Sequence, residues 1–207
     1  MSEEKKEHFV GRLIFELLIV FAGVYGAFVV SDFQDQQRAK RARIAFLQTF
    51  REDLVRMDRQ MVIPRMQVLD SLIVFYESAM AAGKKPELKF HPTIDFTSTM
   101  LVVRAAFNSD YLENIEREHI VSISQGSNLI TLIEKKSDVF QNECRRWFHG
   151  PSYTNDDFYD RSGRLKPGMQ WYLDDMKELR HLLQILDIAI MQGAVKSTDH
   201  LLKKEME

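Results

Sequence analysis

Two Glu-x-x-His motifs are the sharpest candidates for chemistry in this chain: Glu116 with His119, and Glu178 with His181. In four-helix di-iron proteins, each such motif places a carboxylate and an imidazole on one inward helix face. A single Glu from each of two further helices completes the site, and the order of residues here permits that arrangement. The motifs make a membrane-anchored, metal-dependent enzyme the alternative interpretation of this protein.

The helical periodicity around the second motif argues against such a site. Relative to an apolar stripe centred on Leu179, Glu178 lies roughly 100° away and His181 roughly 160° away around the helix. Both side chains are therefore predicted to face solvent, and the first motif alone supplies half a site. We predict no metal and no other cofactor.

Two other groups of residues have chemical interest. Oxygen donors gather at Asn155, Asp156, Asp157 and Asp160, but the spacing of an EF-hand is missing, so we interpret this stretch as a solvated loop. Cys144 lacks a nucleophile signature and is predicted to be a buried, inert thiol. The sequence has no Gly-rich phosphate loop, no G-x-S-x-G elbow and no zinc-spaced Cys/His set, which disfavours enzymes of those classes.

The composition narrows the classes of function further. The 28 Lys and Arg residues nearly balance the 30 Asp and Glu residues, so no global charge draws the protein to nucleic acid, and we predict no nucleic-acid binding. A single cysteine cannot form an intramolecular disulfide, so stability must come from packing. The length of 207 residues suits one domain plus an anchor.

Residues 13–31 form an apolar run with one early acid, after a charged tail at residues 1–12. As a helix, the run spans roughly 28 Å, close to the roughly 30 Å of a hydrocarbon core. No A-x-A-like cleavage site precedes the following polar segment, which favours an uncleaved transmembrane helix over a signal peptide. We therefore predict a single-pass protein anchored in the lipid bilayer of the cell inner membrane.

The span contains two informative spacings. Arg12 and Glu16 lie four residues apart and can pair at the membrane interface, although Glu16 could instead contact a partner helix.

Small residues that let two helices approach closely lie on nearly one face of the span; they are Ala22, Gly23, Gly26 and Ala27. They predict contact through the span with a second copy or with another membrane protein, with chance occurrence as the alternative.

A basic segment follows the span, with Arg38, Lys40, Arg41 and Arg43 within six positions. Near a bilayer, such residues attract anionic headgroups at about 1 kcal/mol per charge. An ordinary solvated helix face is the alternative. Three bases precede the span and four follow it, so the distribution of positive charge leaves the side of the soluble domain undetermined.

The stretch from Glu16 resembles the start of a bacterial family of small membrane proteins of unknown function, whose members open with E-I-x-L-V-V-x-G-x-x-x-A-L-x-I-N-N-W-N-E. Glu16, Gly23 and Ala27 align with that pattern without gaps, while Ser31-Asp32 replaces the Asn pair and Phe33 replaces Trp. A weaker similarity lies in A-A-F-N-S-D-Y-L-E-N-I. The resemblance covers about a third of the chain and implies one N-terminal span with a helical domain, without an established activity.

Residues 32–82 are predicted to form a basic juxtamembrane segment and a long amphipathic helix. Apolar residues recur every three or four positions from Ile44 to Met61, and the pattern resumes after Pro64, which should kink or divide the helix. Gly83 is predicted to lie near the C-terminus of this helix.

Residues 83–207 are predicted to complete the bundle. Residues 95–107 favour a helix over a strand, and Gly126 marks a predicted break. A long loop is expected over 149–168, followed by a helix from about Met169 with an apolar stripe and a tail from Lys196 that frays. The predicted fold is therefore all-α, with one transmembrane helix that continues into an elongated bundle. The predicted function is a non-enzymatic, membrane-tethered scaffold, accessory subunit or receptor-like sensor.

Overall fold

The computed structural model describes the backbone of residues 3–97, 117–148 and 153–207, and the side chains of these residues except 3–19, 22, 117–120, 122 and 123. Every regular element within these ranges is helical, and the one β-type pairing among them is an isolated antiparallel bridge between Tyr159 and Leu165. The prediction of an all-α fold is confirmed. The chain divides into two compact units, Met1–Phe46 and Leu47–Glu207.

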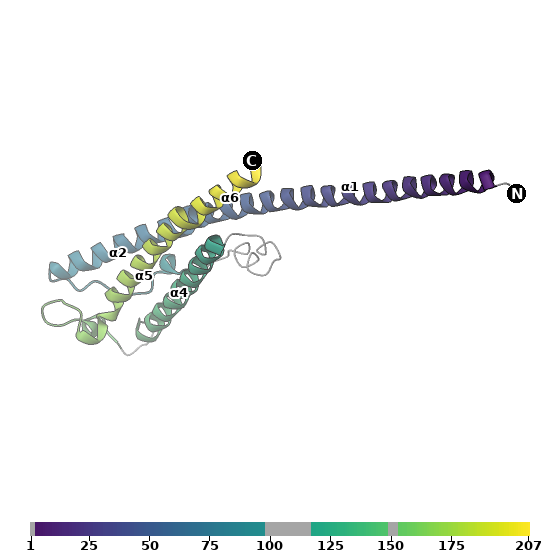
Figure 1. The fold of residues 1–207 in the computed structure, drawn as a ribbon. Helices are drawn as coiled ribbons and strands as arrows, with labels where there is room; N and C mark the ends of the chain where they lie inside the picture. Colours follow the sequence, from purple (N-terminus) through teal and green to yellow (C-terminus); the bar gives the residue numbers. More distant parts are fainter. Residues whose placement is uncertain (1–2, 98–116, 149–152) are drawn as a thin grey trace. The chain divides into compact units, whose positions relative to one another are not determined.

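The first unit consists of the N-terminal part of α1 (Glu3–Met57), an unbroken helix in Figure 1. Among the residues whose side chains are described, no helix is both long enough and apolar enough to cross a membrane. Residues 13–19 and Ala22 of the predicted span lie outside that part of the chain. The transmembrane helix at 13–31 is therefore unsupported by the structure and stays a prediction.

In the second unit, a π-helical segment separates α1 from the next helix. This segment is η1 (Asp58–Val62), and α2 (Ile63–Ala81) follows it directly with Pro64 in its first turn. Proline has no N–H to offer and its ring clashes with the carbonyl group four residues earlier, so a regular α-turn is disfavoured here. The wider turn is closed by the Ile63 N–H, which bonds to the Asp58 carbonyl oxygen. The predicted division of the long helix thus falls just before Pro64.

The end of α2 follows the sequence prediction closely. Gly83 has a φ of 70°, and its N–H bonds to the Met80 carbonyl oxygen at 2.9 Å, while the Lys84 N–H bonds to Ala79 O at 2.9 Å. These two bonds form a Schellman motif, in which glycine accepts the left-handed conformation at no steric cost. The chain then enters a connector that includes the short 3-10 helix η2 (Pro92–Ile94).

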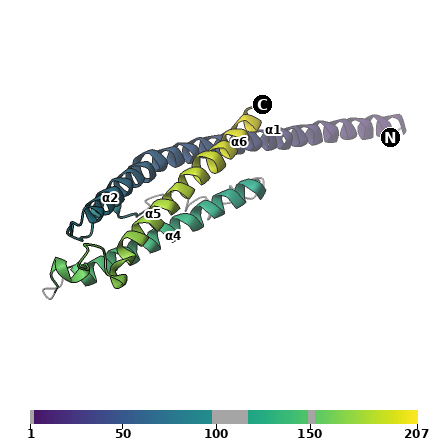
Figure 2. The same ribbon diagram turned by 90° about the vertical axis from the view of Figure 1, so that its left-hand side faces the viewer.

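Three later helical elements complete the second unit: α4 (Arg117–Phe148), α5 (Trp171–Ile188) and α6 (Lys196–Met206). A π-helical segment, η6 (Ala189–Val195), joins α5 to α6. In Figures 1 and 2, α5 lies beside both α2 and α4, and it packs against both of them. The predicted apolar stripe of the last long helix is buried in this core; it consists of Tyr172, Met176, Leu179, Leu183, Leu186 and Ile190.

Two predictions about this unit are wrong. The helix α4 continues through Gly126, because one glycine costs only about 1 kcal/mol in a helix whose other contacts hold it in place. Residues from Lys196 form α6 rather than a frayed tail, because Thr198 and Leu201 are buried against the bundle. The prediction for residues 95–107 falls mostly outside the described residues.

The described part of the long loop is folded into short turns. It contains the 3-10 helices η4 (Asn155–Phe158) and η5 (Pro167–Met169), with the Tyr159–Leu165 bridge between them. Phe158, Tyr159 and Met169 are buried in the core of the unit. The loop is therefore held by its own hydrophobic anchors.

Candidate functional site

The second Glu-x-x-His motif lies on the exposed face of α5. Both Glu178 and His181 are exposed, and Glu178 Oε2 accepts a hydrogen bond from Lys136 Nζ of α4 at 2.6 Å. Glu116 and His119 lie outside the residues whose side chains are described. Within the described residues, no three His, Cys, Asp or Glu side chains gather as metal ligands do.

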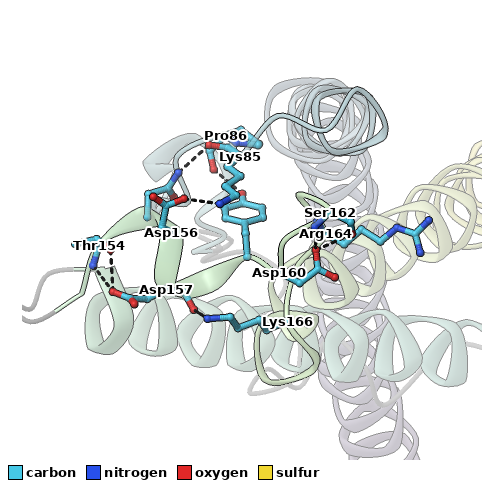
Figure 3. Close-up of polar contacts among 11 residues, drawn as sticks. Lys85, Pro86, Thr154, Asp156, Asp157, Asp160, Ser162, Arg164 and Lys166 are labelled. Atoms are coloured by element: carbon cyan, nitrogen blue, oxygen red, sulfur yellow. Dashed lines mark hydrogen bonds and ion pairs between the residues drawn. The ribbon is translucent and has the colours of Figure 1, made fainter.

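The acidic residues of the loop stabilise its turns, as Figure 3 shows. Asp157 Oδ2 accepts hydrogen bonds from the Thr154 N–H at 2.8 Å and from its hydroxyl group at 2.9 Å. Asp160 Oδ1 accepts from the N–H groups of Ser162 at 2.8 Å and Arg164 at 3.0 Å. Hydrogen bonds lower the pKa of both carboxyl groups. The largest contribution comes from the Thr154 backbone N–H for Asp157 and from the Ser162 hydroxyl group for Asp160.

The same loop is tied to the connector that follows α2 (Figure 3). Asp156 Oδ1 pairs with Lys85 Nζ at 2.6 Å, and the Asn155 side-chain amide donates to the Lys85 carbonyl oxygen at 2.7 Å. The Tyr159 hydroxyl donates to the Pro86 carbonyl oxygen at 2.5 Å. The carboxylates of Asp156, Asp157 and Asp160 are thus bonded within the fold and belong to no group of three candidate metal ligands among the described residues. The Asn155 Oδ1 atom, in contrast, is buried without a hydrogen-bond partner in that part of the chain.

Two buried tyrosines also bond to the connector that follows α2. The Tyr172 hydroxyl donates to the Lys89 carbonyl oxygen at 2.6 Å and lies 3.0 Å from the Tyr76 hydroxyl. Tyr76 in turn contacts the Glu87 carbonyl oxygen at 3.0 Å and His91 Nε2 at 3.1 Å. Burial is the main cause that raises the pKa of both tyrosines and lowers that of His91. All three groups are therefore held neutral, which suits a structural network better than proton transfer.

Cys144 lies on α4 and is fully buried. Burial is the main cause that raises the pKa of its thiol to about 12. The thiol is protonated at neutral pH, and a protonated thiol is a poor nucleophile. Its surroundings agree with the prediction of an inert, buried cysteine.

The most unusual titratable group is one that the sequence analysis missed. Asp58 is 2 % exposed, and its Oδ1 atom has no hydrogen-bond partner among the described residues. Burial, followed by the negative charge of the half-buried Asp187, raises the pKa of Asp58 to about 6. Asp58 stands four residues after Leu54 and four before Val62, both buried, so an acid on the apolar face was the available signal.

A small cavity lies within the second unit, and neither of the two acids is among the residues that line it. Its volume is about 20 Å³, and its lining is largely apolar. The lining includes Met57 and Ala189, which are close in sequence to the two acids, together with Gly126 and Ser127 of α4. A space of this size holds about one water molecule, which excludes it as a pocket for an organic ligand.

The first unit presents an apolar helix surface. The large apolar side chains of α1 from Val20 to Phe33 are 51–72 % exposed; they are Val20, Phe21, Val24, Tyr25, Phe28, Val29, Val30 and Phe33. Of the predicted small-residue face, Gly23 and Ala27 are exposed, Gly26 is half-buried, and Ala22 lies outside the described side chains. Arg12 and Glu16 also lie outside that part.

The basic segment is described in full. Arg38 pairs with Asp35 at 3.6 Å within one helical turn, and both side chains are well exposed. Arg41 is exposed, while Lys40 and Arg43 are half-buried. Exposed pairs of this kind contribute about 0–1 kcal/mol, so Arg38 could exchange Asp35 for another charged group at little cost.

Comparisons with known protein families, with curated proteins and with solved structures find no match to this chain. The function must therefore be argued from the residues and their geometry.

Proposed function

We propose that the protein is a non-enzymatic interaction module, tethered to a bacterial inner membrane by one crossing of residues 13–31. The observation that carries this proposal is the apolar surface of α1, where every large apolar side chain from Val20 to Phe33 is more than half exposed. The location in a bacterial membrane rests on the resemblance of the stretch that starts at Glu16.

The physical argument concerns the cost of that surface in water. Full burial of a Val or Phe side chain contributes roughly 1.5–3 kcal/mol relative to exposure, so a run of such residues favours transfer into a hydrocarbon layer. A helix is suited to that transfer, because all of its backbone groups are hydrogen-bonded within the segment. The lipid bilayer is the proposed partner of this surface.

The remaining features fit a tethering role. The small-residue face with Gly23 and Ala27 would let the span contact a second copy or another membrane protein. The basic segment from Arg38 to Arg43 would lie at the headgroups. The bundle would act as a scaffold, accessory subunit or receptor-like sensor, since its buried tyrosines and thiol are neutral groups suited to packing.

Membrane fractionation of the full chain tests this proposal. The wild-type protein is expected to sediment with membranes and to stay there after extraction with alkaline carbonate. The double variant Val24→Arg/Phe28→Arg should be released, because each Arg near the centre of a span costs about 2.5–3.5 kcal/mol.

A matched control is available on α2. Val74 and Phe75 are 61 % and 57 % exposed, so Val74→Arg/Phe75→Arg adds the same charges outside the span and should leave sedimentation unchanged. Release of the wild-type protein by carbonate would overturn the proposal. Protease treatment of intact spheroplasts then assigns the side of the domain: digestion only after lysis places it in the cytoplasm.

A further inference from the structure

The charged residues of α2 are all bound within the second unit, which leaves its solvent-facing side uncharged. The helix has three charged side chains, and each contacts a group of another element. These contacts are Arg65 with the Asp95 carbonyl oxygen at 2.6 Å, Asp70 with Arg180 at 2.8 Å, and Glu77 with Lys177 at 2.7 Å. On the solvent-facing side, the largest apolar side chains are Val74 and Phe75, which are 61 % and 57 % exposed.

Such a helix is unusual on the surface of a helical bundle. Surface helices generally place charged and polar residues opposite the buried stripe, whereas a helix that is apolar all round is generally buried by other elements. In α2, Leu69 and Tyr76 are buried in the core, while Val74, Phe75 and Ser78 are exposed. The described part of the second unit therefore covers α2 on one side only.

An open groove of about 670 Å³ lies on the uncovered side, towards the C-terminus of α2. Its apolar lining includes Val74, Phe75, Ala79 and Ala82. The start of the connector adds two basic residues to the lining, Lys84 and Lys85. The groove is far larger than the core cavity of about 20 Å³, and its volume is within the range of binding sites.

The positive charge of the groove is only partly neutralised. Lys85 Nζ pairs with Asp156 Oδ1 at 2.6 Å, whereas Lys84 is exposed and forms no ion pair with another described residue. Among the described residues, no acid lines the groove. Lys84 is therefore available to a carboxylate group from another molecule.

A second copy of this chain does not supply that carboxylate through the same surface. In a two-fold symmetric dimer, both subunits contribute the same patch. The two acids of α2 are Asp70 and Glu77, and both are already paired with basic residues of α5. Lys84 of one copy would therefore find no free acid on α2 of the other copy.

A lipid surface also fits the groove less well than a helix does. Recognition of anionic headgroups generally uses a cluster of about four to eight basic residues, and the groove offers only Lys84 as an unpaired one. An apolar groove instead suits the protruding side chains of an amphipathic helix, which lays its apolar face into the groove.

We propose that this groove docks an acidic amphipathic helix of a partner protein. The apolar face of the partner helix covers Val74, Phe75 and Ala79, and a Glu or Asp side chain of that helix pairs with Lys84. The proposal rests on the interaction role proposed above and adds the class of partner and its binding surface. It does not depend on how the chain is held at the membrane, because the groove lies entirely in the second unit.

Photo-crosslinking of the full chain in its native cells tests this proposal. A photoreactive benzoylphenylalanine replaces Ser78, an exposed residue that lines the groove, and the control carries it in place of the exposed Asp138 of α4. The label at position 78 should crosslink to a protein segment that has the pattern of an amphipathic helix with a Glu or Asp, and the control label should not. In the labelled chain, Lys84→Glu should lower the yield about tenfold, because repulsion replaces attraction, whereas Lys84→Arg should preserve it.

Charge exchange in a binding measurement identifies the contact. The crosslinked segment is synthesised as a peptide, and fluorescence anisotropy measures its binding to the purified full chain in detergent micelles. Lys84→Glu should weaken binding about tenfold, and a peptide with Lys in place of its acid should bind Lys84→Glu better than it binds the wild type. Val74→Arg/Phe75→Arg should abolish binding without lowering the melting temperature, because both side chains lie outside the core.

Several outcomes would overturn the proposal. They are the absence of a protein crosslink at position 78, a crosslink to lipid or to a second copy, a partner segment without an acid, and equal binding of the peptide to the wild type and to Lys84→Glu. If the double Arg variant loses stability, Lys84→Glu decides, since it changes one exposed side chain. Failure of the membrane tether gives a different result, because alkaline carbonate then releases the wild type while the crosslink at position 78 persists.

Discussion

The Tyr172 hydroxyl group joins segments that are far apart in the sequence. It bonds to the Lys89 carbonyl oxygen of the connector at 2.6 Å and contacts the Tyr76 hydroxyl of α2 at 3.0 Å, from its own position on α5. The sequence predicted one apolar stripe after Pro64 and another in the last long helix, and Tyr76 and Tyr172 are buried members of these stripes. It could not predict their polar partners, because those are backbone atoms of a connector whose path depends on tertiary packing.

Removal of this hydroxyl should cost measurable stability. In Tyr172→Phe, the Lys89 carbonyl oxygen loses its short hydrogen bond in a partly buried site, and the free energy of unfolding should fall by about 1–3 kcal/mol. Urea denaturation measures the change. Tyr153→Phe is the matched control, because Tyr153 is 50 % exposed and should change stability by less than about 0.5 kcal/mol. Equal effects of the two substitutions would contradict the role assigned to the Tyr172 hydroxyl.

At the scale of elements, apolar periodicity and the breaking signal at Pro64 were reliable guides, whereas the breaking signal at Gly126 was not. Pro64 affects the backbone through its own ring and missing N–H, so its effect on the long helix could be predicted. Gly126 has only a weak preference against helix, which the packing of α4 overrides. The π-helical segments have no simple sequence pattern. The burial of Asp58 was therefore not predicted, because it depends on the register of η1.

Two glycine substitutions distinguish a permissive position from a required one. A Cβ atom at Gly126 would meet nothing within 4 Å, so Gly126→Ala should raise the free energy of unfolding by about 0.5–1 kcal/mol through helix propensity. Gly163 has a φ of 79°, and a Cβ atom there would lie 2.9 Å from the Gly83 backbone. Gly163→Ala should therefore lower stability by at least about 1 kcal/mol, because strain and a clash act together. Chemical denaturation of both variants checks these opposite signs, and a loss of stability in Gly126→Ala would mean that the α4 packing cannot accept a methyl group.

At the scale of the whole molecule, the chain has two units with different surfaces. The second unit buries a continuous apolar core, and two residues of α6, which the sequence analysis had assigned to a tail, are buried as well. Charge-rich sequence from Lys196 onward suggested fraying, but the two buried residues Thr198 and Leu201 outweigh that composition. The first unit instead exposes its large apolar side chains from Val20 to Phe33.

This division predicts that the second unit folds without the first. A chain that begins at Gln36 keeps about three helical turns before the unit boundary at Leu47, which protects the first core residues from fraying. Its denaturation midpoint should match that of the second unit in the full chain, because no described core residue precedes Leu47. The shortened chain should stay in the supernatant when membranes are sedimented, whereas the full chain is expected to sediment with them. Loss of cooperative unfolding would show that residues 1–35 contribute to the core, and sedimentation with membranes would place the membrane-binding surface in the bundle rather than in the apolar stretch of α1.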